Sequence, residues 1–228
     1  MATIAQNLQL VHARMAGACD LAHRLGQSVA LLVVSKTFGA DHVREAHACG
    51  ERQFGENYVQ EALDKMADLR DLRADLCWHL IGPLQSNKTR AVAQAFDWVH
   101  SIDRLKIAQR LSEQRPAHLP PLQVCLQVNI SGETSKSGVA PVDLPALAHA
   151  VAALPRLQLR GLMAIPEATP TVDDQRLAYR ALRVLLDQLK HQGLALDTLS
   201  MGMSADLEAA IMEGATLVRV GTAIFGAR

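Results

Sequence analysis

One lysine in this chain lies where a lysine can take part in carbonyl chemistry. Lys36 follows the unbroken apolar run of residues 29–34, from which only Ser35 separates it. Such a run is typical of a strand buried on both faces, and parallel α/β folds place their chemistry at the carboxyl ends of strands. Burial disfavours the ammonium form of a lysine, and the neutral amine forms Schiff bases with carbonyl compounds. The segment alone is explained at least as well by a lysine that extends its ammonium to water.

The loops after the last two expected strands are a second place for chemistry. In α/β barrels these loops often hold a phosphate, using backbone amides and a helix N-terminus. Ser204 is a candidate N-cap for an expected helix over residues 205–212. Gly221 allows another group to approach the backbone closely, and Thr222 beside it adds a hydroxyl donor. Helix capping alone also explains a serine at position 204, and capping and phosphate binding can use the same geometry.

Polar residues and glycines gather just after nearly every expected strand. These segments are residues 35–37, 55–58, 82–88, 101–103, 129–131, 200–204 and 219–222. Turns favour Gly, Asn, Ser and Asp, so each segment alone has an ordinary structural explanation. In a barrel all of them would face the rim that carries the active site.

Other polar residues are weaker candidates. His79 and His100 lie in strand-like runs and are interpreted as structural histidines with hydrogen-bond partners. Lys88 and Arg90 either bind an anion or belong to a solvated loop. Residues 133–138 form a polar loop that either closes over a ligand or has no such role.

Strands and helices are expected to alternate along the whole chain. The expected strands are residues 29–34, 53–57, 77–82, 98–103, 122–129, 159–165, 198–201 and 217–220. The main expected helices are residues 4–25, 41–48, 59–66, 143–154, 173–191 and 205–212, with another ending near 113. About eight such units predict a parallel (β/α)8 barrel that forms one domain over residues 1–228. A doubly wound open sheet remains an alternative, although no G-x-G-x-x-G follows a strand.

Composition excludes several classes of function. The chain has 228 residues, 49% of them hydrophobic, and 23 basic residues balance 23 acidic ones. This balance gives no electrostatic footprint for nucleic acid. No apolar stretch approaches the ~20 residues of a membrane span, and the first residues do not resemble a signal peptide. We therefore expect a cytoplasmic protein without a nucleic-acid or membrane partner.

A series of motifs then resembles one family closely. In chain order they are residues 33–37 (VVSKT), 54–61 (FGENYVQE), 78–88 (WHLIGPLQSNK), 100–103 (HSID), 127–131 (QVNIS), 135–138 (SKSG), 160–166 (RGLMAIP), 200–204 (SMGMS) and 218–226 (VRVGTAIFG). This set resembles the pyridoxal phosphate homeostasis proteins, also called the YggS or PLP-binding protein family. The resemblance covers nearly all of the chain from about residue 29.

The resemblance implies a barrel like the N-terminal domain of alanine racemase, with pyridoxal 5′-phosphate (PLP) as its cofactor. Lys36 matches the lysine that forms the Schiff base with PLP. Ser204, Gly221 and Thr222 match positions of the phosphate site. These assignments coincide with the lysine and the loops that the residues themselves single out.

The resemblance also places two further residues beside the cofactor. Arg219 matches the residue that faces the pyridine nitrogen, and Asn57 matches a position lining the cofactor. An arginine there disfavours protonation of the ring nitrogen and weakens the ring as an electron sink. Arg219 therefore suits stored cofactor better than broad carbanion chemistry, although the related racemases share this feature.

Two functions of different classes follow from the resemblance. One is a carrier or regulator in intracellular PLP homeostasis without substantial turnover, and the other is a PLP-dependent amino-acid racemase. Racemisation needs an acid/base group on each face of the substrate. Alanine racemase-like enzymes take the second group, a tyrosine, from an added domain of the partner subunit, whereas this chain ends at Arg228 and has only Tyr58 and Tyr179. We expect a monomeric carrier or regulator, not an enzyme, with recipient apo-enzymes as partners.

Overall fold

The structure, a computed structural model, is a closed barrel of parallel strands. It describes residues 2–132, 137–167, 169 and 171–226. The strands are β1 (Ala30–Val34), β2 (Gln53–Glu56), β3 (Cys77–Leu80), β4 (Trp98–Ile102), β5 (Leu122–Gln127), β6 (Leu157–Met163), β7 (Thr198–Ser200) and β8 (Leu217–Val220). They pair in chain order, and β8 pairs with β1 to close the barrel. The expected barrel is confirmed, and the open sheet is excluded.

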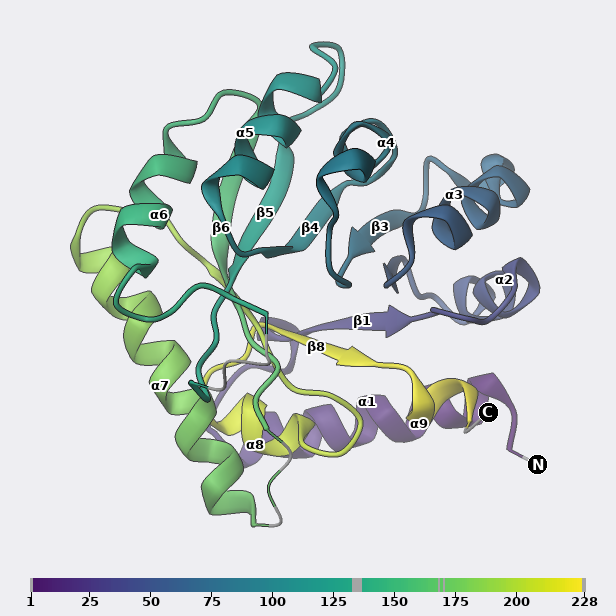
Figure 1. The fold of residues 1–228 in the computed structure, drawn as a ribbon. Coiled ribbons are helices and arrows are strands. Elements are labelled where there is room, and N and C mark those ends of the chain that lie inside the picture. The colour runs from purple at the N-terminus through teal and green to yellow at the C-terminus, as the bar shows by residue number, and fades with distance from the viewer. Residues whose placement is uncertain (1, 133–136, 168, 170, 227–228) are drawn as a thin grey trace.

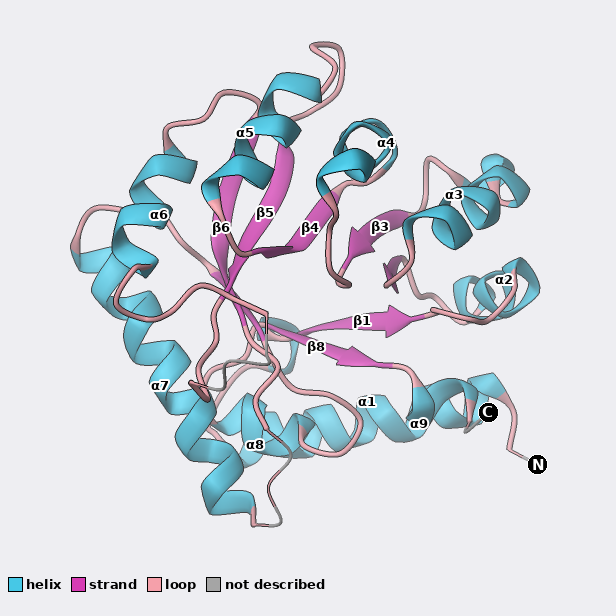
Figure 2. Cartoon of the chain, in the orientation of Figure 1, coloured by secondary structure: helices cyan, strands magenta, loops and turns pink. Residues whose placement is uncertain are grey.

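Helices form an outer ring around the strands (Figures 1 and 2). They are α1 (Ile4–Leu21), α2 (Ala40–Ala48), α3 (Val59–Asp68), α4 (Thr89–Ala95), α5 (Leu105–Gln114), α6 (Leu144–Ala152), α7 (Val172–His191), α8 (Leu207–Met212) and α9 (Thr222–Phe225). The N-terminal helix α1 packs against α8, α9 and α2. It therefore occupies the place in the ring after β8, where α9 is too short to cover the barrel. No helix of the described residues is long and apolar enough to cross a membrane.

Several element boundaries differ from the expectation. Helix α1 ends at Leu21, not near residue 25, because His23 adopts a positive φ of 53°. A 3-10 turn at Gly26–Ser28 then leads into β1. The sequence analysis does not predict the short helices α4 and α9. Each directly follows a polar or glycine-containing segment, and such a segment favours a turn.

Strand β1 is buried on both faces, which explains its unbroken apolar run. Val33 and Phe54 belong to the main core between the barrel and the helices. Val34, one residue further along β1, lines a pocket inside the barrel mouth. Because successive side chains of a strand point to opposite faces, the same alternation sets the direction of every residue at the strand ends.

A buried glutamate fastens α7 to the end of α8, the helix that follows the Ser204 loop. Glu213 is 2% exposed and accepts hydrogen bonds from Arg176 at 2.9 Å and Arg180 at 2.8 Å. Arg183 adds an ion pair at 3.4 Å. Burial of Glu213 acts against ionisation, but the bonds from Arg180 and Arg176 outweigh it and hold its pKa below the ordinary value of 4.5.

We expect Glu213→Gln to lower the free energy of unfolding at pH 7 by about 1.5–3 kcal/mol, the range for a lost hydrogen bond to a charged group. A carboxylate with a lowered folded-state pKa stabilises fully above its unfolded pKa, and this stabilisation is lost as pH falls through its folded pKa. The difference between wild type and variant should therefore shrink below its ordinary pKa of 4.5.

Urea unfolding at pH 7 and at about pH 3.5 measures this difference. Glu113→Gln is the matched control, because Glu113 is exposed and its carboxylate makes no ion pair among the described residues. An equal effect of Glu213→Gln at both pH values would contradict the prediction.

Candidate functional site

One pocket is lined by all six residues that the sequence analysis assigned to a cofactor site, which are Lys36, Asn57, Ser204, Arg219, Gly221 and Thr222. It has a volume of about 530 Å³ and opens at the carboxyl ends of the strands. Its lining residues are Val34, Lys36, Asn57, Ile81, Gly82, Pro83, Gln127, Ser137, Ile165, Met203, Ser204, Ala205, Arg219, Gly221 and Thr222. These residues come from segments spread over most of the chain, so the pocket exists only in the closed barrel.

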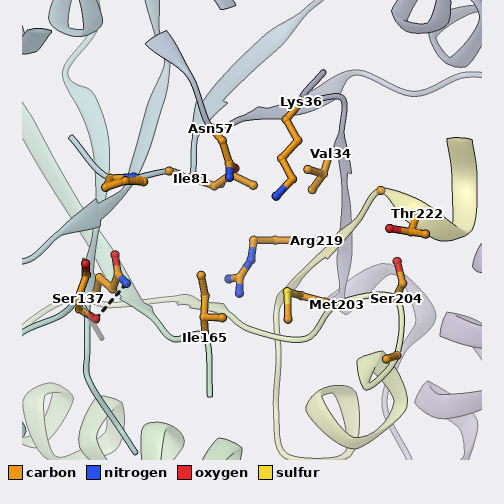
Figure 3. A pocket seen from close by; sticks show the side chains of 15 residues that line it. Val34, Lys36, Asn57, Ile81, Ser137, Ile165, Met203, Ser204, Arg219 and Thr222 are labelled. Carbon is orange, nitrogen blue, oxygen red and sulfur yellow. Dashed lines mark hydrogen bonds between the residues drawn. The ribbon is translucent and has the colours of Figure 1, made fainter. Parts of the chain in front are cut away.

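Lys36 enters the pocket from the end of β1. Val34 and Lys36 line the cavity, whereas Ser35 between them is fully buried on the helix side, as strand alternation requires. Figure 3 shows the Lys36 side chain extending from the rim toward the Arg219 guanidinium. The amine is thus presented to the cavity, and Lys36 is half-buried there.

Asn57 lies beside Lys36 on the next strand end (Figure 3). Its backbone is packed tightly against Gly82, the residue that follows β3 by two positions. A Cβ added to Gly82 would lie 2.3 Å from the Asn57 carbonyl oxygen, so only glycine allows this approach. The close contact of these two strand ends forms one wall of the pocket.

Ser204 and Thr222 lie together at the other side of the cavity, beyond Val34 (Figure 3). The Ser204 hydroxyl accepts a hydrogen bond from the Ala223 amide at 3.4 Å, which joins the two loops. Gly221 permits the end of β8 to approach β1, because an added Cβ would lie 2.9 Å from the Val34 carbonyl oxygen. Two hydroxyls and a closely packed backbone therefore meet at one point.

The prediction that Ser204 caps the following helix is wrong. Helix α8 begins at Leu207, and Asp206 is its N-cap residue. The Asp206 carboxylate accepts the Met203 amide at 2.6 Å and the Tyr179 hydroxyl at 2.7 Å. Asp206 thereby holds the loop, and the Ser204 hydroxyl lines the pocket instead of capping the helix.

Arg219 is a buried cation in the pocket wall. It is 4% exposed and donates hydrogen bonds to the Ser200 carbonyl at 2.6 Å, the Ser200 hydroxyl at 2.8 Å and the Ala164 carbonyl at 2.8 Å. No carboxylate among the described residues forms an ion pair with it. Burial lowers the pKa of Arg219, yet a guanidinium remains protonated in proteins. The pocket therefore contains a fixed positive charge held by neutral acceptors.

A chain of hydrogen bonds continues from Arg219 through the barrel interior. The Ser200 hydroxyl contacts His100 Nδ1 at 2.8 Å, and His100 Nε2 contacts His79 Nδ1 at 2.9 Å. Burial lowers the pKa of His79 to about 3 and that of His100 well below its ordinary value, so both rings are neutral at pH 7. Both histidines are thus interior residues with hydrogen-bond partners, as predicted.

Some pocket residues were not singled out from the sequence. Ile165 and Met203 belong to motifs of the series, but an apolar residue carries no chemical signal that separates it from the core. Gln127 also lines the cavity and donates a hydrogen bond to the Ser137 carbonyl at 3.1 Å. Lys88 and Arg90 do not line the pocket. In the expected polar loop, residues 133–136 lie outside the described part of the chain.

Comparison with known proteins places this chain in a family. The family model for the alanine racemase N-terminal domain matches residues 3–228. A pyridoxal phosphate homeostasis protein of Pseudomonas aeruginosa is 66% identical over 228 residues, which are 100% of this chain and 97% of that protein. The chain belongs to the pyridoxal phosphate homeostasis protein family. A second homeostasis protein, from Escherichia coli K12, is 53% identical over 100% of this chain and 98% of its own.

Solved structures agree with this membership of the pyridoxal phosphate homeostasis family. PipY of Synechococcus elongatus PCC7942, solved with PLP bound, is 40% identical with a TM-score of 0.84. The match covers 98% of this chain and 100% of PipY. Alanine racemase from Corynebacterium glutamicum shares the fold, with a TM-score of 0.67 and 19% identity over 97% of this chain and 62% of the racemase.

Proposed function

We propose that this protein binds PLP in the barrel-mouth pocket and acts in PLP homeostasis as a carrier or regulator. The observation that carries the proposal is the meeting of Lys36, Arg219 and the Ser204–Thr222 hydroxyl pair in one cavity. The bound PLP of the relative PipY supports the choice of ligand.

The residues present fit the three functional groups of PLP. Lys36 supplies an amine for covalent attachment to the aldehyde. Ser204 and Thr222 supply hydroxyl donors, and Gly221 supplies accessible backbone, for the phosphate. Arg219 supplies a buried donor for the pyridine nitrogen, and Asn57 lines the cofactor beside Lys36. When bound, PLP supplies an electrophilic aldehyde and an electron-accepting ring.

Arg219 adjusts the chemistry that this pocket supports. Its guanidinium is held by three hydrogen bonds, to the carbonyl and hydroxyl oxygens of Ser200 and to the carbonyl oxygen of Ala164. None of these acceptors takes up a proton at neutral pH, so the positive charge stays on Arg219. A permanent cation beside a ring nitrogen disfavours a second positive charge there. The arrangement favours retention of the cofactor over strong carbanion stabilisation.

The ionisable groups of the pocket also favour a carrier over a racemase. Lys36 and Arg219 are the ionisable side chains among the described residues that line it. Tyr58 is 58% exposed, and Tyr179 donates its hydroxyl hydrogen to Asp206. Neither tyrosine lines the pocket, whereas racemisation needs a second acid/base group opposite the lysine. We propose that a monomer holds PLP and passes it to recipient apo-enzymes.

We expect the PLP-loaded protein to convert no amino acid at an enzymatic rate, because the pocket offers one acid/base group where racemisation needs two. Chiral analysis of alanine and serine incubated with the loaded protein measures turnover. In parallel, an apo-enzyme that regains activity on mixing reports transfer of PLP. Multiple-turnover racemisation that disappears in Lys36→Ala would show that the protein is a racemase and would contradict the carrier proposal.

A further inference from the structure

A buried ionic cluster lies directly behind Lys36, on the helix side of the strand ends. Glu56 at the end of β2 is 0% exposed, and Lys65 of α3 is 5% exposed. Their ion pair spans 2.6 Å. The pocket residues described above do not include either side chain.

Lys65 is the centre of this cluster. Its ammonium donates to Glu56 Oε1 at 2.6 Å, to the Ser35 carbonyl at 2.8 Å and to Glu61 Oε1 at 3.3 Å. An ammonium has three hydrogens, so these three acceptors satisfy it completely. The Ser35 hydroxyl also donates to Glu56 Oε1 at 2.6 Å.

The cluster holds both chain neighbours of Lys36. Ser35 is bound through its carbonyl and its hydroxyl, and the Thr37 amide donates to Glu61. Thr37 has a φ of 65°, a left-handed conformation that is unfavourable for a β-branched residue. The bond to Glu61 stabilises this turn, which fixes the direction in which Lys36 leaves the strand.

The energetics indicate a role beyond stability. A buried ion pair contributes little more than well-packed apolar residues of the same size, because desolvation offsets the attraction. In the described part of the chain, Glu56 Oε2 is buried and has no hydrogen-bond partner, which adds a further cost. A costly cluster attached to the residues on either side of one lysine is explained by the geometry it imposes on that lysine.

We infer that Glu56, Lys65 and Glu61 are positioning residues that aim Lys36 at the aldehyde of PLP. The inference rests on the proposed function. It assigns the cluster to the covalent step and not to binding of the phosphate. The residues proposed for the phosphate, Ser204 and Thr222, lie on the other side of the pocket (Figure 3).

Two ligands separate these roles. Pyridoxine 5′-phosphate has the ring and the phosphate but no aldehyde, so it reports the pocket without covalent attachment. PLP reports both. We expect Lys65→Met to bind pyridoxine 5′-phosphate with unchanged affinity and to attach PLP to Lys36 about 10–100-fold more slowly, the loss typical of a misplaced reacting group.

The attachment rate is measured by stopped-flow absorbance, and the site by borohydride reduction and peptide mass. Lys65→Met leaves Glu56 buried without its partner, and this variant could fail to fold for that reason. Two further variants test the same role without leaving Glu56 unpaired. Glu56→Leu with Lys65→Met replaces the pair by apolar residues. Glu61→Met keeps the Glu56–Lys65 pair and removes the half-exposed carboxylate that accepts from the Thr37 amide and from Lys65. Both should slow attachment in the same way.

Asp71→Asn is the matched control. It breaks the ion pair of 2.7 Å between Asp71 and Arg44 of α2. Within the described residues, the hydrogen bonds of Arg44 go to Asp71 and the Asp68 carbonyl and not to the end of β1. This variant should attach PLP at the wild-type rate. Wild-type attachment in all cluster variants, or an equal loss of both ligands, would overturn the positioning role. Wild-type protein that binds neither ligand would overturn the proposed function itself.

Discussion

Lys36→Ala is expected to lose covalent attachment of PLP completely while keeping the fold. The amine is the group that bonds to the aldehyde, and alanine has no nucleophile to replace it. Lys36 is half-buried at the pocket rim and is not part of the main core, so its removal leaves the packing of the barrel intact. The visible absorption band of lysine-bound PLP should therefore be absent at every PLP concentration.

Borohydride reduction followed by peptide mapping tests the same assignment in the wild-type protein. The pyridoxyl group should be found on Lys36. Lys88→Ala is the matched control, because Lys88 lies in a strand-end segment but does not line the pocket. An adduct found mainly on Lys88 or Lys136 would show that the covalent site was assigned to the wrong lysine.

The double variant Ser204→Ala, Thr222→Ala should have the second large effect, on the affinity for PLP. Each lost hydrogen bond to a charged phosphate costs about 1.5–3 kcal/mol. Together the two substitutions should weaken binding by about 10²- to 10⁴-fold, since 1.4 kcal/mol corresponds to tenfold. Thr222 is exposed and Ser204 is half-buried, so the fold should be unaffected.

Equilibrium dialysis with PLP, and with pyridoxine 5′-phosphate in parallel, measures this loss without reliance on the covalent bond. Thr222→Ser keeps the hydroxyl and is the matched control, for which near wild-type affinity is expected. Unchanged affinity in the double variant would show that the phosphate does not bind at Ser204 and Thr222.

Much of the site could be predicted because its signals are local. An apolar run that ends in a polar residue marks a strand end, and the strand ends of a parallel barrel share one rim. This reasoning located Lys36, Gly221 and Thr222 without knowledge of any contact. The resemblance of the motifs added Arg219 and Asn57, whose residue types alone do not distinguish them from ordinary strand-end residues.

The role of Ser204 shows where local reasoning fails. A serine just before a helical stretch is a good N-cap by sequence, but Asp206 is the N-cap in the structure. Asp206 is bound by the hydroxyl of Tyr179, a residue of α7 that is 27 positions earlier in the chain. The Asp206 carboxylate binds Tyr179 and the Met203 amide and makes no capping bond within α8, so the usual capping pattern does not mark this helix start.

The sequence by itself determined the alternation of strands and helices, the strand ends and the lysine at the first of them, because apolar periodicity and turn residues act over short distances. The tertiary structure decided between the open sheet and the barrel, through the pairing of β8 with β1. Only the tertiary structure decided what holds these residues in place. Arg219 depends on acceptors from β7 and the residue after β6. Ser35 and Thr37, on either side of Lys36, are bound by side chains of β2 and α3. Such partners carry no shared pattern along the chain, since closure of the barrel alone brings them within hydrogen-bond distance.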